Sequence, residues 1–380
     1  MGIETKRTIG MAEIKLTEAE IAAATAVLRS GALRQGKECD LFEQEFAKKT
    51  GARHAVTSSN GSAALHLAYM AFLQPGEEVI VPSFTFIATA SMVRAAGGKP
   101  VFCDVDPETF LMDLDDAERR ITERTCALSP VHLFGNVCAI DRFQEFANRH
   151  GLKIVWDAAQ AHGAGFDGLD VGGFGDFVSY SFYPSKNMFV GEGGITLTDD
   201  EEMAHRMRFM RSHGQTGKYL HTMHGLNYRM TDVEAAIGRK QLERLDDMLQ
   251  VRRRNLAILT DGLASVDGIL PQRVTPRSSH AVHQFCVTVD PRVAGLDRDL
   301  LAEALRGFGV ATGVHYPRGL HQQPIFIEEY GAASLPVTER LCETILALPV
   351  HHGMSEEDAH HVVDAVKASL ASAQSKRLTG

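Results

Sequence analysis

Short apolar runs alternate with segments of helical periodicity from about residue 54 to residue 200. Runs such as EVIVP at 78–82 and KIVWD at 153–157 are typical of buried strands. Strands that alternate with helices indicate a parallel or mixed sheet covered on both faces, and so an α/β fold. The other strands are expected at 54–59, 100–105, 126–131, 177–182 and 194–198, and the helices at 61–72, 85–97 and 141–151.

The pattern changes after residue 230. Thr231 and Glu234 form a capping-box pattern that opens a long helix, expected over 231–263. A small α+β domain follows, with strands expected at 283–289 and 312–317 and helices at 296–309, 337–348 and 355–370.

These patterns divide the chain into three parts. A second capping-box pattern, at Thr17 to Glu20, predicts an N-terminal helix within residues 1–30 that packs with the small domain. The large domain is expected over 31–245 and the small C-terminal domain over 246–380, where residues 372–380 read as a frayed tail.

Composition narrows the class of protein. The 380 residues exceed one ordinary domain, and with 44% hydrophobic and 23% charged residues the chain can form a packed core. A net charge of −9 argues against nucleic acid or an anionic membrane as the main partner. Any phosphate must therefore be bound locally, by backbone N–H groups.

Cysteines and termini point to a cytoplasmic location. The six cysteines form no Cys-x-x-Cys pair, which favours free thiols in a reducing compartment. Residues 1–16 lack the apolar core of a signal peptide, and no stretch has the apolar length of a membrane span. A soluble cytoplasmic protein is expected.

The first candidate site is the turn SSNGSA, which follows the strand at 54–57 and opens a helix. Exposed N–H groups and the helix dipole make such a turn a site for an anion, best suited to a phosphate. Gly61 lets the backbone approach closely, and Ser62 adds a hydroxyl. Taken alone, the turn is better explained as an ordinary capped helix start.

Two further strands end in ionisable groups. Asp157 follows KIVW, and a carboxylate there needs a cation, such as a protonated pyridine nitrogen. Alone it could also cap a helix or bind a metal. Lys186 follows the strand at 177–182, and an amine in a partly dry pocket has a lowered pKa and forms a Schiff base with an aldehyde. Taken alone, Lys186 is best explained as a solvated turn lysine.

The combination is more specific than its parts. A phosphate cradle, an aspartate and a lysine at three strand ends match the needs of pyridoxal phosphate, whose ring acts as an electron sink. The glycines at 191, 193 and 194 are expected to leave room for ring and substrate.

The chain also resembles the DegT/DnrJ/EryC/StrS sugar aminotransferases, which have the aspartate-aminotransferase fold (fold type I). The resemblance rests on SSNGSAALHLA, GEEVIVPSFTFIATA, KPVFCDVDPETF, SPVHLFGN, WDAAQAHGA, GDFVSYSFYPSKNMFVGEGG and LNYRMTDVEAAIG, and more loosely on LPVTERLCETILALPVH. These stretches run from about residue 30 to 350. The resemblance implies a large domain with a mixed, mostly parallel sheet between helices and a smaller α+β domain.

The resemblance also implies roles around the cofactor ring. Lys186 would be the Schiff-base lysine and proton shuttle, and Asp157 would pair with the pyridine nitrogen. Gln160 would touch the ring hydroxyl, and Phe86 would stack on the ring.

Other residues would hold the phosphate and the substrate. Ser62 and Ala63 would bind phosphate by backbone N–H beside the Ser181 hydroxyl. Asn227 would reach it from the neighbouring subunit, which implies a homodimer with shared active sites. Arg229 is a candidate for the donor carboxylate, or for a structural ion pair. His315 and Tyr316 are candidates for the sugar or the donor.

The reaction implied is amino transfer from L-glutamate to a nucleotide-linked keto sugar, with the 4-keto position favoured over the 3-keto position. Lys186 favours amino transfer, because relatives with histidine there run dehydrations. A cyclitol aminotransferase and a regulatory protein that binds the cofactor without turnover remain alternatives.

Two other motifs carry less weight. Residues 163–168 match a dinucleotide fingerprint by letter, but no strand precedes them and no helix follows. The pairs His351–His352 and His360–His361 lack further ligands, so no metal site is expected.

Overall fold

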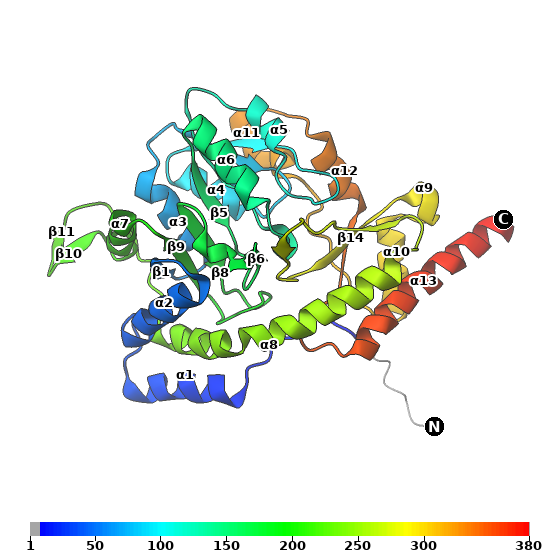
Figure 1. The fold of residues 1–380 in the computed structure, drawn as a ribbon, viewed down its shortest axis with the longest axis horizontal. Helices are drawn as coiled ribbons and strands as arrows, with labels where there is room; N and C mark the ends of the chain where they lie inside the picture. Colours follow the sequence, from blue (N-terminus) through cyan, green and yellow to red (C-terminus); the bar gives the residue numbers. More distant parts are fainter. Residues whose placement is uncertain (1–7, 380) are drawn as a thin grey trace.

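The computed structural model describes residues 8–379 and is built around a seven-stranded sheet (Figure 1). The strand order is β1-β9-β8-β5-β4-β2-β3, and only β9 runs antiparallel to its neighbours. The sheet is therefore mixed and mostly parallel, as predicted. Its strands are β1 (His54–Ser58), β2 (Glu78–Pro82), β3 (Lys99–Cys103), β4 (Thr125–Leu128), β5 (Lys153–Asp157), β8 (Phe177–Ser181) and β9 (Gly194–Thr198).

Helices cover both faces of this sheet, because its strands are apolar on both sides. Along β5, Val155 packs in one buried cluster and Trp156 in the other, and in β8 Phe177 and Val178 alternate in the same way. The helices of this part are α2 (Lys37–Thr50), α3 (Gly61–Phe72), α4 (Ala88–Ala95), α5 (Leu114–Arg119), α6 (Ile140–His150) and α7 (Glu201–Arg211).

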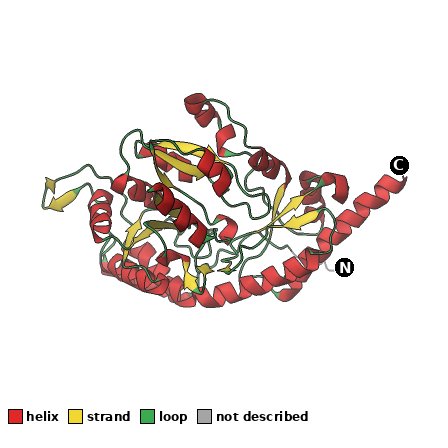
Figure 2. Ribbon diagram, turned by 45° about the horizontal axis from the view of Figure 1, so that its top comes forward, coloured by secondary structure: helices red, strands yellow, loops and turns green. Residues whose placement is uncertain are grey.

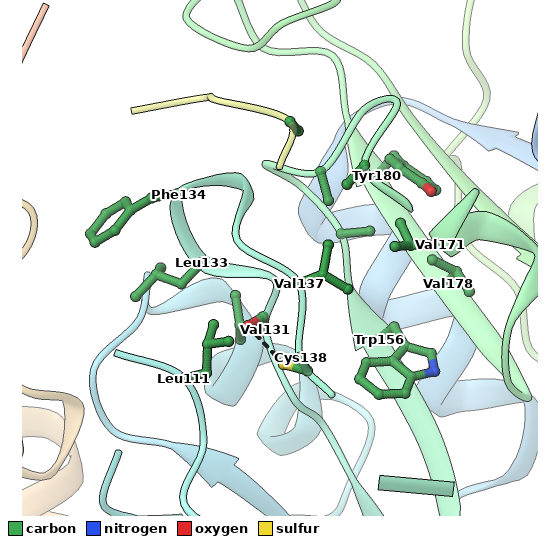
Figure 3. Packing of buried hydrophobic residues seen from close by; sticks show 14 of the residues in the cluster. Leu111, Val131, Leu133, Phe134, Val137, Cys138, Trp156, Val171, Val178 and Tyr180 are labelled. Atoms are coloured by element: carbon green, nitrogen blue, oxygen red, sulfur yellow. Dashed lines mark hydrogen bonds between the residues drawn. The ribbon is translucent and has the colours of Figure 1, made fainter. Parts of the chain in front are cut away.

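The loop after β4 packs onto one of these clusters. Figure 3 shows Val137 and Cys138 of this loop beside Trp156 of β5, with Val178 of β8 nearby and Leu133 farther away, near Val131. The imidazole of His132 stacks on Trp156, with ring centroids 4.9 Å apart. This packing fixes the short 3-10 helix Leu133–Gly135, which faces the strand ends.

A long helix, α8 (Asp232–Leu263), joins the two sheets and runs along the base of the molecule (Figure 2). Thr231 and Glu234 form the predicted capping box at its start. The predicted boundary between residues 245 and 246 lies inside α8, so both parts of the chain share this helix.

The C-terminal part contains a three-stranded sheet of β12 (Ile269–Pro271), β14 (Phe285–Val289) and β15 (Ile345–Leu348). Its helices cover a separate apolar cluster. They include α9 (Pro291–Ala294), α10 (Arg298–Gly307) and α13 (Glu356–Thr379). By contrast, α12 (Pro336–Thr344) packs against the large part through Leu341 and Cys342, and α11 (Pro324–Tyr330) does so through Phe326.

Three predictions for this part were wrong. The helix expected over 337–348 ends at Thr344, because the buried run Ile345–Leu348 pairs with β14. The segment 312–317 forms no strand and pairs only through Gly313 with Ala347. The tail expected to fray continues α13 to Thr379.

The N-terminal helix α1 (Glu18–Ser30) has its predicted capping box but lies along α8. Glu20 is buried and pairs with Arg244 of α8 at 3.1 Å. The preceding residue Ile9 bridges Val310 of the small part, so the contact expected of the helix is made by the segment before it. Residues 1–7, part of the segment tested for a signal peptide, lie outside the described residues.

Two hairpins complete the fold. Residues 163–168 include β6 (Gly165–Phe166), which pairs with β7 (Leu169–Asp170) and β13 (Ser278–Ser279). A dinucleotide site has a strand, a turn and a helix in this place, so these residues do not have its structure. A second hairpin, β10 (Gln215–Gly217) and β11 (Leu220–His221), stands out from the body (Figure 1). All six cysteines are free, as predicted. Within residues 8–379, no helix combines the length and apolar character needed to cross a membrane.

Candidate active site

The carboxyl ends of β1, β2, β5 and β8 meet at one edge of the large sheet and border a cavity of about 640 Å³. Ligands of open α/β sheets bind at this edge. Nine of the residues singled out from the sequence line it: Gly61, Ser62, Phe86, Asp157, Gln160, Ser181, Lys186, His315 and Tyr316.

The turn after β1 is a helix start pressed against β8. A Cβ atom on Gly61 would lie 2.5 Å from Cβ of Ser181, so only glycine permits this approach. The side chain of Asn60 caps α3 by accepting a hydrogen bond of 2.8 Å from the N–H of Ala63. The N–H groups of Gly61 and Ser62 precede this capped position and have no internal helical partner. Together with the Ser181 hydroxyl they form a cradle suited to an anion.

Asp157, at the end of β5, is buried and doubly hydrogen-bonded. Its Oδ2 accepts a bond of 2.7 Å from the Thr89 hydroxyl, and its Oδ1 accepts one of 3.1 Å from the N–H of Ala159. Burial raises the pKa of Asp157, while these two bonds and the charge of Lys186 oppose the rise. A buried carboxylate held in this way is ready to pair with a cationic ring nitrogen.

Lys186 lies in the turn after β8 and faces the same cavity. Burial lowers the pKa of its amine from 10.5 to about 8, and the attraction of Asp157 limits the change. An amine with this pKa is partly neutral near physiological pH, which a nucleophile requires. Of the described residues that line the cavity, Lys186 is the one lysine or arginine.

Gln160 has a fixed orientation. Its Oε1 accepts a hydrogen bond of 2.5 Å from the N–H of Phe134, whose backbone has a left-handed φ of 62°. Its Nε2 lies 3.4 Å from the hydroxyl of Tyr316. The amide therefore presents its donor group toward the cavity.

Phe86 and Tyr316 form an aromatic wall. Phe86 is 56% exposed, although it lines the cavity, and its ring centroid lies 6.3 Å from that of Tyr316. A large apolar ring left open to a cavity offers a stacking surface for a planar ligand.

Three predicted residues do not line the cavity. Ala63 is buried, and its N–H is bonded to Asn60. Asn227 is exposed and bridges Ser212, close to the β10–β11 hairpin. Arg229 donates a hydrogen bond of 3.1 Å to the Ser212 hydroxyl. Asn227 and Arg229 therefore lie outside the cavity of their own chain.

The interpretation of the glycines after Lys186 was wrong. A Cβ atom on Gly193 would lie 2.7 Å from the Met230 methyl group, and one on Gly194 would lie 2.3 Å from the carbonyl oxygen of Asn60. Gly191, Gly193 and Gly194 do not line the cavity. Gly193 and Gly194 allow β9 to pack closely and leave no room for a ring.

Sequence reasoning missed several contributors. Thr89 orients Asp157, and a hydroxyl in the apolar helix start after β2 was the available signal. His283 lines the cavity from a loop before β14, and no motif pointed to it. Further lining residues that were not singled out include Tyr183, Ser185, Glu192 and Gln284.

The histidine pairs have structural surroundings. Nδ1 of His351 accepts from the N–H of Gly353 at 3.2 Å, and His361 contacts the carbonyl oxygen of Phe308 at 2.9 Å. In the part of the chain that the structure describes, no three His, Cys, Asp or Glu side chains come together as metal ligands would.

The residues present fit pyridoxal phosphate. The cradle at Gly61 and Ser62 suits the phosphate, and the buried Asp157 lacks a cation beyond Lys186. The exposed face of Phe86 suits a planar ring, and Lys186 can react with its aldehyde.

Comparison with known proteins agrees with this geometry. The model of the DegT/DnrJ/EryC1/StrS aminotransferase family matches residues 15–367. A pleiotropic regulatory protein of Geobacillus stearothermophilus is 38% identical over 90% of this chain and 91% of its own length. A UDP-N-acetyl-3-dehydro-alpha-D-glucosamine 3-aminotransferase of Acidithiobacillus ferrooxidans is 37% identical over 88% and 89% of the two chains.

Solved structures show the same fold. The crystal structure of S. venezuelae DesV in complex with a ketimine intermediate superposes with a TM-score of 0.91. It is 36% identical and covers 96% of this chain and 98% of its own. The chain therefore belongs to the DegT/DnrJ/EryC1/StrS aminotransferase family, and it is a pyridoxal-phosphate-dependent sugar aminotransferase of fold type I.

Proposed function

We propose that this enzyme transfers the amino group of L-glutamate to a nucleotide-linked keto sugar in the cytoplasm. The observation that carries the proposal is the joint placement of Lys186, Asp157 and the Gly61–Ser62 cradle around one cavity. The relative from A. ferrooxidans, which is named for amino transfer to a UDP-linked keto sugar, supports this substrate class. Six free cysteines agree with a reducing compartment.

Each residue has a defined task in this proposal. Bound pyridoxal phosphate supplies an aldehyde and an electron-accepting ring. Asp157 would keep the ring nitrogen protonated, Gln160 would donate to the ring hydroxyl, and Phe86 would stack on the ring. The amine of Lys186 would hold the cofactor through its aldehyde and, when free, would serve as the acid and base that moves a proton.

The phosphate and the substrate are assigned to other groups. The N–H groups of Gly61, Ser62 and Ala63 and the hydroxyl of Ser181 are proposed to bind the phosphate. The N–H of Ala63 already donates to the side chain of Asn60, so it would have to be shared between Asn60 and the phosphate. Tyr316 and His315, which line the cavity, are proposed to contact the sugar or the donor.

The enzyme is proposed to act as a homodimer with shared sites. Lys186 is the one cation among the described lining residues, whereas the substrates carry several negative charges. Asn227 lies outside its own cavity, next to a protruding hairpin in which Tyr219 and Leu220 are 85% and 58% exposed. We propose that Asn227 and Arg229 complete the cavity of a second copy, where Asn227 binds the phosphate and Arg229 the donor carboxylate.

The test is a substrate panel. The purified enzyme with pyridoxal phosphate and L-glutamate is given matched 3-keto and 4-keto nucleotide sugars and, as a separate arm, a keto cyclitol. Formation of an amino sugar from a nucleotide-linked ketone, lost in Lys186→Ala, supports the proposal. Turnover of the cyclitol alone refutes it.

The position of the ketone is a separate prediction. The 4-keto position is expected from the resemblance alone, whereas the A. ferrooxidans relative is named for the 3-position. A rate with the 4-keto sugar below that with the 3-keto sugar would show this expectation to be wrong.

A regulatory role is the second candidate, because the relative from G. stearothermophilus is named as a regulatory protein. The visible spectrum separates the two candidates. An enzyme bleaches from the yellow pyridoxal form when L-glutamate is added, whereas a binding protein without turnover keeps its colour.

A further inference from the structure

His283 is a buried histidine to which the proposed function assigns no task. Its side chain is 7% exposed and lines the same cavity as Lys186. Its Nδ1 is buried and has no hydrogen-bond partner among the described residues. Burying an imidazole nitrogen without a partner costs free energy, so we expect a hydrogen-bonding group to reach this ring within the cavity.

The backbone around His283 is held firmly. The N–H groups of His283 and Gln284 both donate to the carbonyl oxygen of Phe134, at 3.0 and 3.1 Å. Gly135 is required there, because a Cβ atom on it would lie 2.9 Å from the nitrogen of Val282. The same turn donates to Gln160 through the N–H of Phe134. The position of His283 is thus fixed relative to the cofactor-facing amide.

The same segment is tied to the turn that carries Lys186. The next residue, Asn187, is 1% exposed, and its Nδ2 donates a hydrogen bond of 2.6 Å to the carbonyl oxygen of Ala281. The segment 281–284 therefore contacts both the Lys186 turn and the Gln160 turn. The backbone of His283 is therefore tied to the turn that carries Lys186.

The charges around His283 keep its ring neutral. Burial is the main cause of its lowered pKa, and the positive charge of Lys186 is the next. The other ionisable groups that face it are Arg252, His162 and His315. Nη1 of Arg252 donates a hydrogen bond of 3.0 Å to the carbonyl oxygen of Val282. A neutral imidazole has one nitrogen free to accept a hydrogen bond.

The amine of Lys186 also lacks a hydrogen-bond partner: it makes no hydrogen bond or ion pair with the described residues, although it faces a cavity. We propose that His283 is a positioning residue that accepts a hydrogen bond from the protonated amine of Lys186 and orients it whenever the amine is not joined to the cofactor. This inference rests on the role given to Lys186 in the proposed function, and it names the group that presents the lysine for proton transfer.

The experiment measures Lys186 directly, without donor or sugar. The full-length apoenzyme reacts with trinitrobenzenesulfonate over a range of pH, and modified Lys186 is quantified by peptide mass. The wild-type midpoint is expected at about 8. His283→Phe removes the acceptor, so the midpoint should fall by about one pH unit. His283→Gln supplies an amide oxygen as acceptor, so its midpoint should return most of the way to the wild-type value.

A matched control is His315→Phe, which removes another ring from the same cavity. It should shift the midpoint less than His283→Phe does. An unchanged midpoint in His283→Phe, or a larger shift in His315→Phe, would overturn the proposal. Because no sugar is used, this failure would leave the proposed substrate class untouched.

A second measurement covers the case in which the phenylalanine variant does not fold. In wild-type apoenzyme with labelled histidine, the ring nitrogen shifts of His283 should follow the titration of Lys186 and show a step near pH 8. Lys186→Met should abolish this step. A wild-type spectrum without the step, or a step that persists in Lys186→Met, would refute the hydrogen bond.

Discussion

The hydroxyl of Thr89, at the start of α4, donates a hydrogen bond of 2.7 Å to Oδ2 of Asp157, at the end of β5. The two residues are 68 positions apart in the chain. The bond favours the charged form of the carboxylate and so opposes the rise in its pKa that burial causes. Thr89 is therefore a positioning residue for the group expected to pair with the cofactor ring.

Replacing Thr89 by valine keeps the shape of the side chain but removes the donor. A hydrogen bond to a charged group contributes about 1.5–3 kcal/mol. We expect kcat/KM to fall roughly tenfold to a hundredfold. Thr89→Ser, which keeps the hydroxyl, should retain most activity. Equal activity of the valine variant and wild type would show that Asp157 does not need this bond.

Gln160→Glu separates the two ends of the amide. A glutamate still accepts from the N–H of Phe134 but has no donor toward the cavity. We expect the melting temperature to change little and the affinity for pyridoxal phosphate to drop, since a carboxylate repels an ionised ring hydroxyl. Titration with the cofactor, followed by absorbance, measures this. Unchanged affinity would place the ring hydroxyl elsewhere.

Gly61→Ala tests the approach of α3 to β8. The added methyl group would lie 2.5 Å from Cβ of Ser181, so the helix start must move away from the strand. We expect cofactor affinity to fall at least about tenfold, because phosphate donors must point at one centre. Gly307→Ala is the matched control, since its new Cβ would meet nothing within 4 Å. Similar losses in both variants would refute a local cause.

Lys186 also makes stability depend on pH. Burial lowers its pKa from 10.5 to about 8, so the folded chain binds this proton less tightly than the unfolded chain. The resulting penalty on folding is full below pH 8 and disappears as pH rises toward 10.5. Apo Lys186→Met should therefore be more stable than wild type at about pH 7, with a smaller gain at about pH 10. Urea unfolding at both values measures this, and an equal gain would contradict the lowered pKa.

Complementation tests the shared site. Lys186→Ala and Asn227→Ala are each expected to lose most activity. In a random mixture of the two chains, about one site in four combines an intact Lys186 with an intact Asn227 from the other chain. Activity should return on mixing to about that fraction. No recovery, in a mixture shown to exchange subunits, would place Asn227 outside the neighbouring site.

The local patterns predicted most of the large sheet correctly. Buried strands such as Glu78–Pro82 and Lys153–Asp157 are marked by short apolar runs, and the start of α8 by its capping box. Each of these signals spans only a few residues, so it can be recognised without knowledge of the fold. The placement of Lys186 and Asp157 at strand ends followed from them.

The errors came from segments whose state depends on distant partners. Ile345–Leu348 continues a helical pattern, yet it becomes a strand because β14 offers an edge to pair with. Gly193 and Gly194 were expected to leave room for the cofactor ring, but they are packed against Met230 and Asn60. No local pattern contains these neighbours.

The sequence by itself determined the chemistry available: a lysine, an aspartate and a phosphate turn at three strand ends of an α/β fold. Only the tertiary structure decided how these groups are held. It brought Thr89 to Asp157 and His283 to the cavity of Lys186, and it left Asn227 outside. The physical reason is that such contacts join residues far apart in the chain, and packing and hydrogen bonding in the folded core select them.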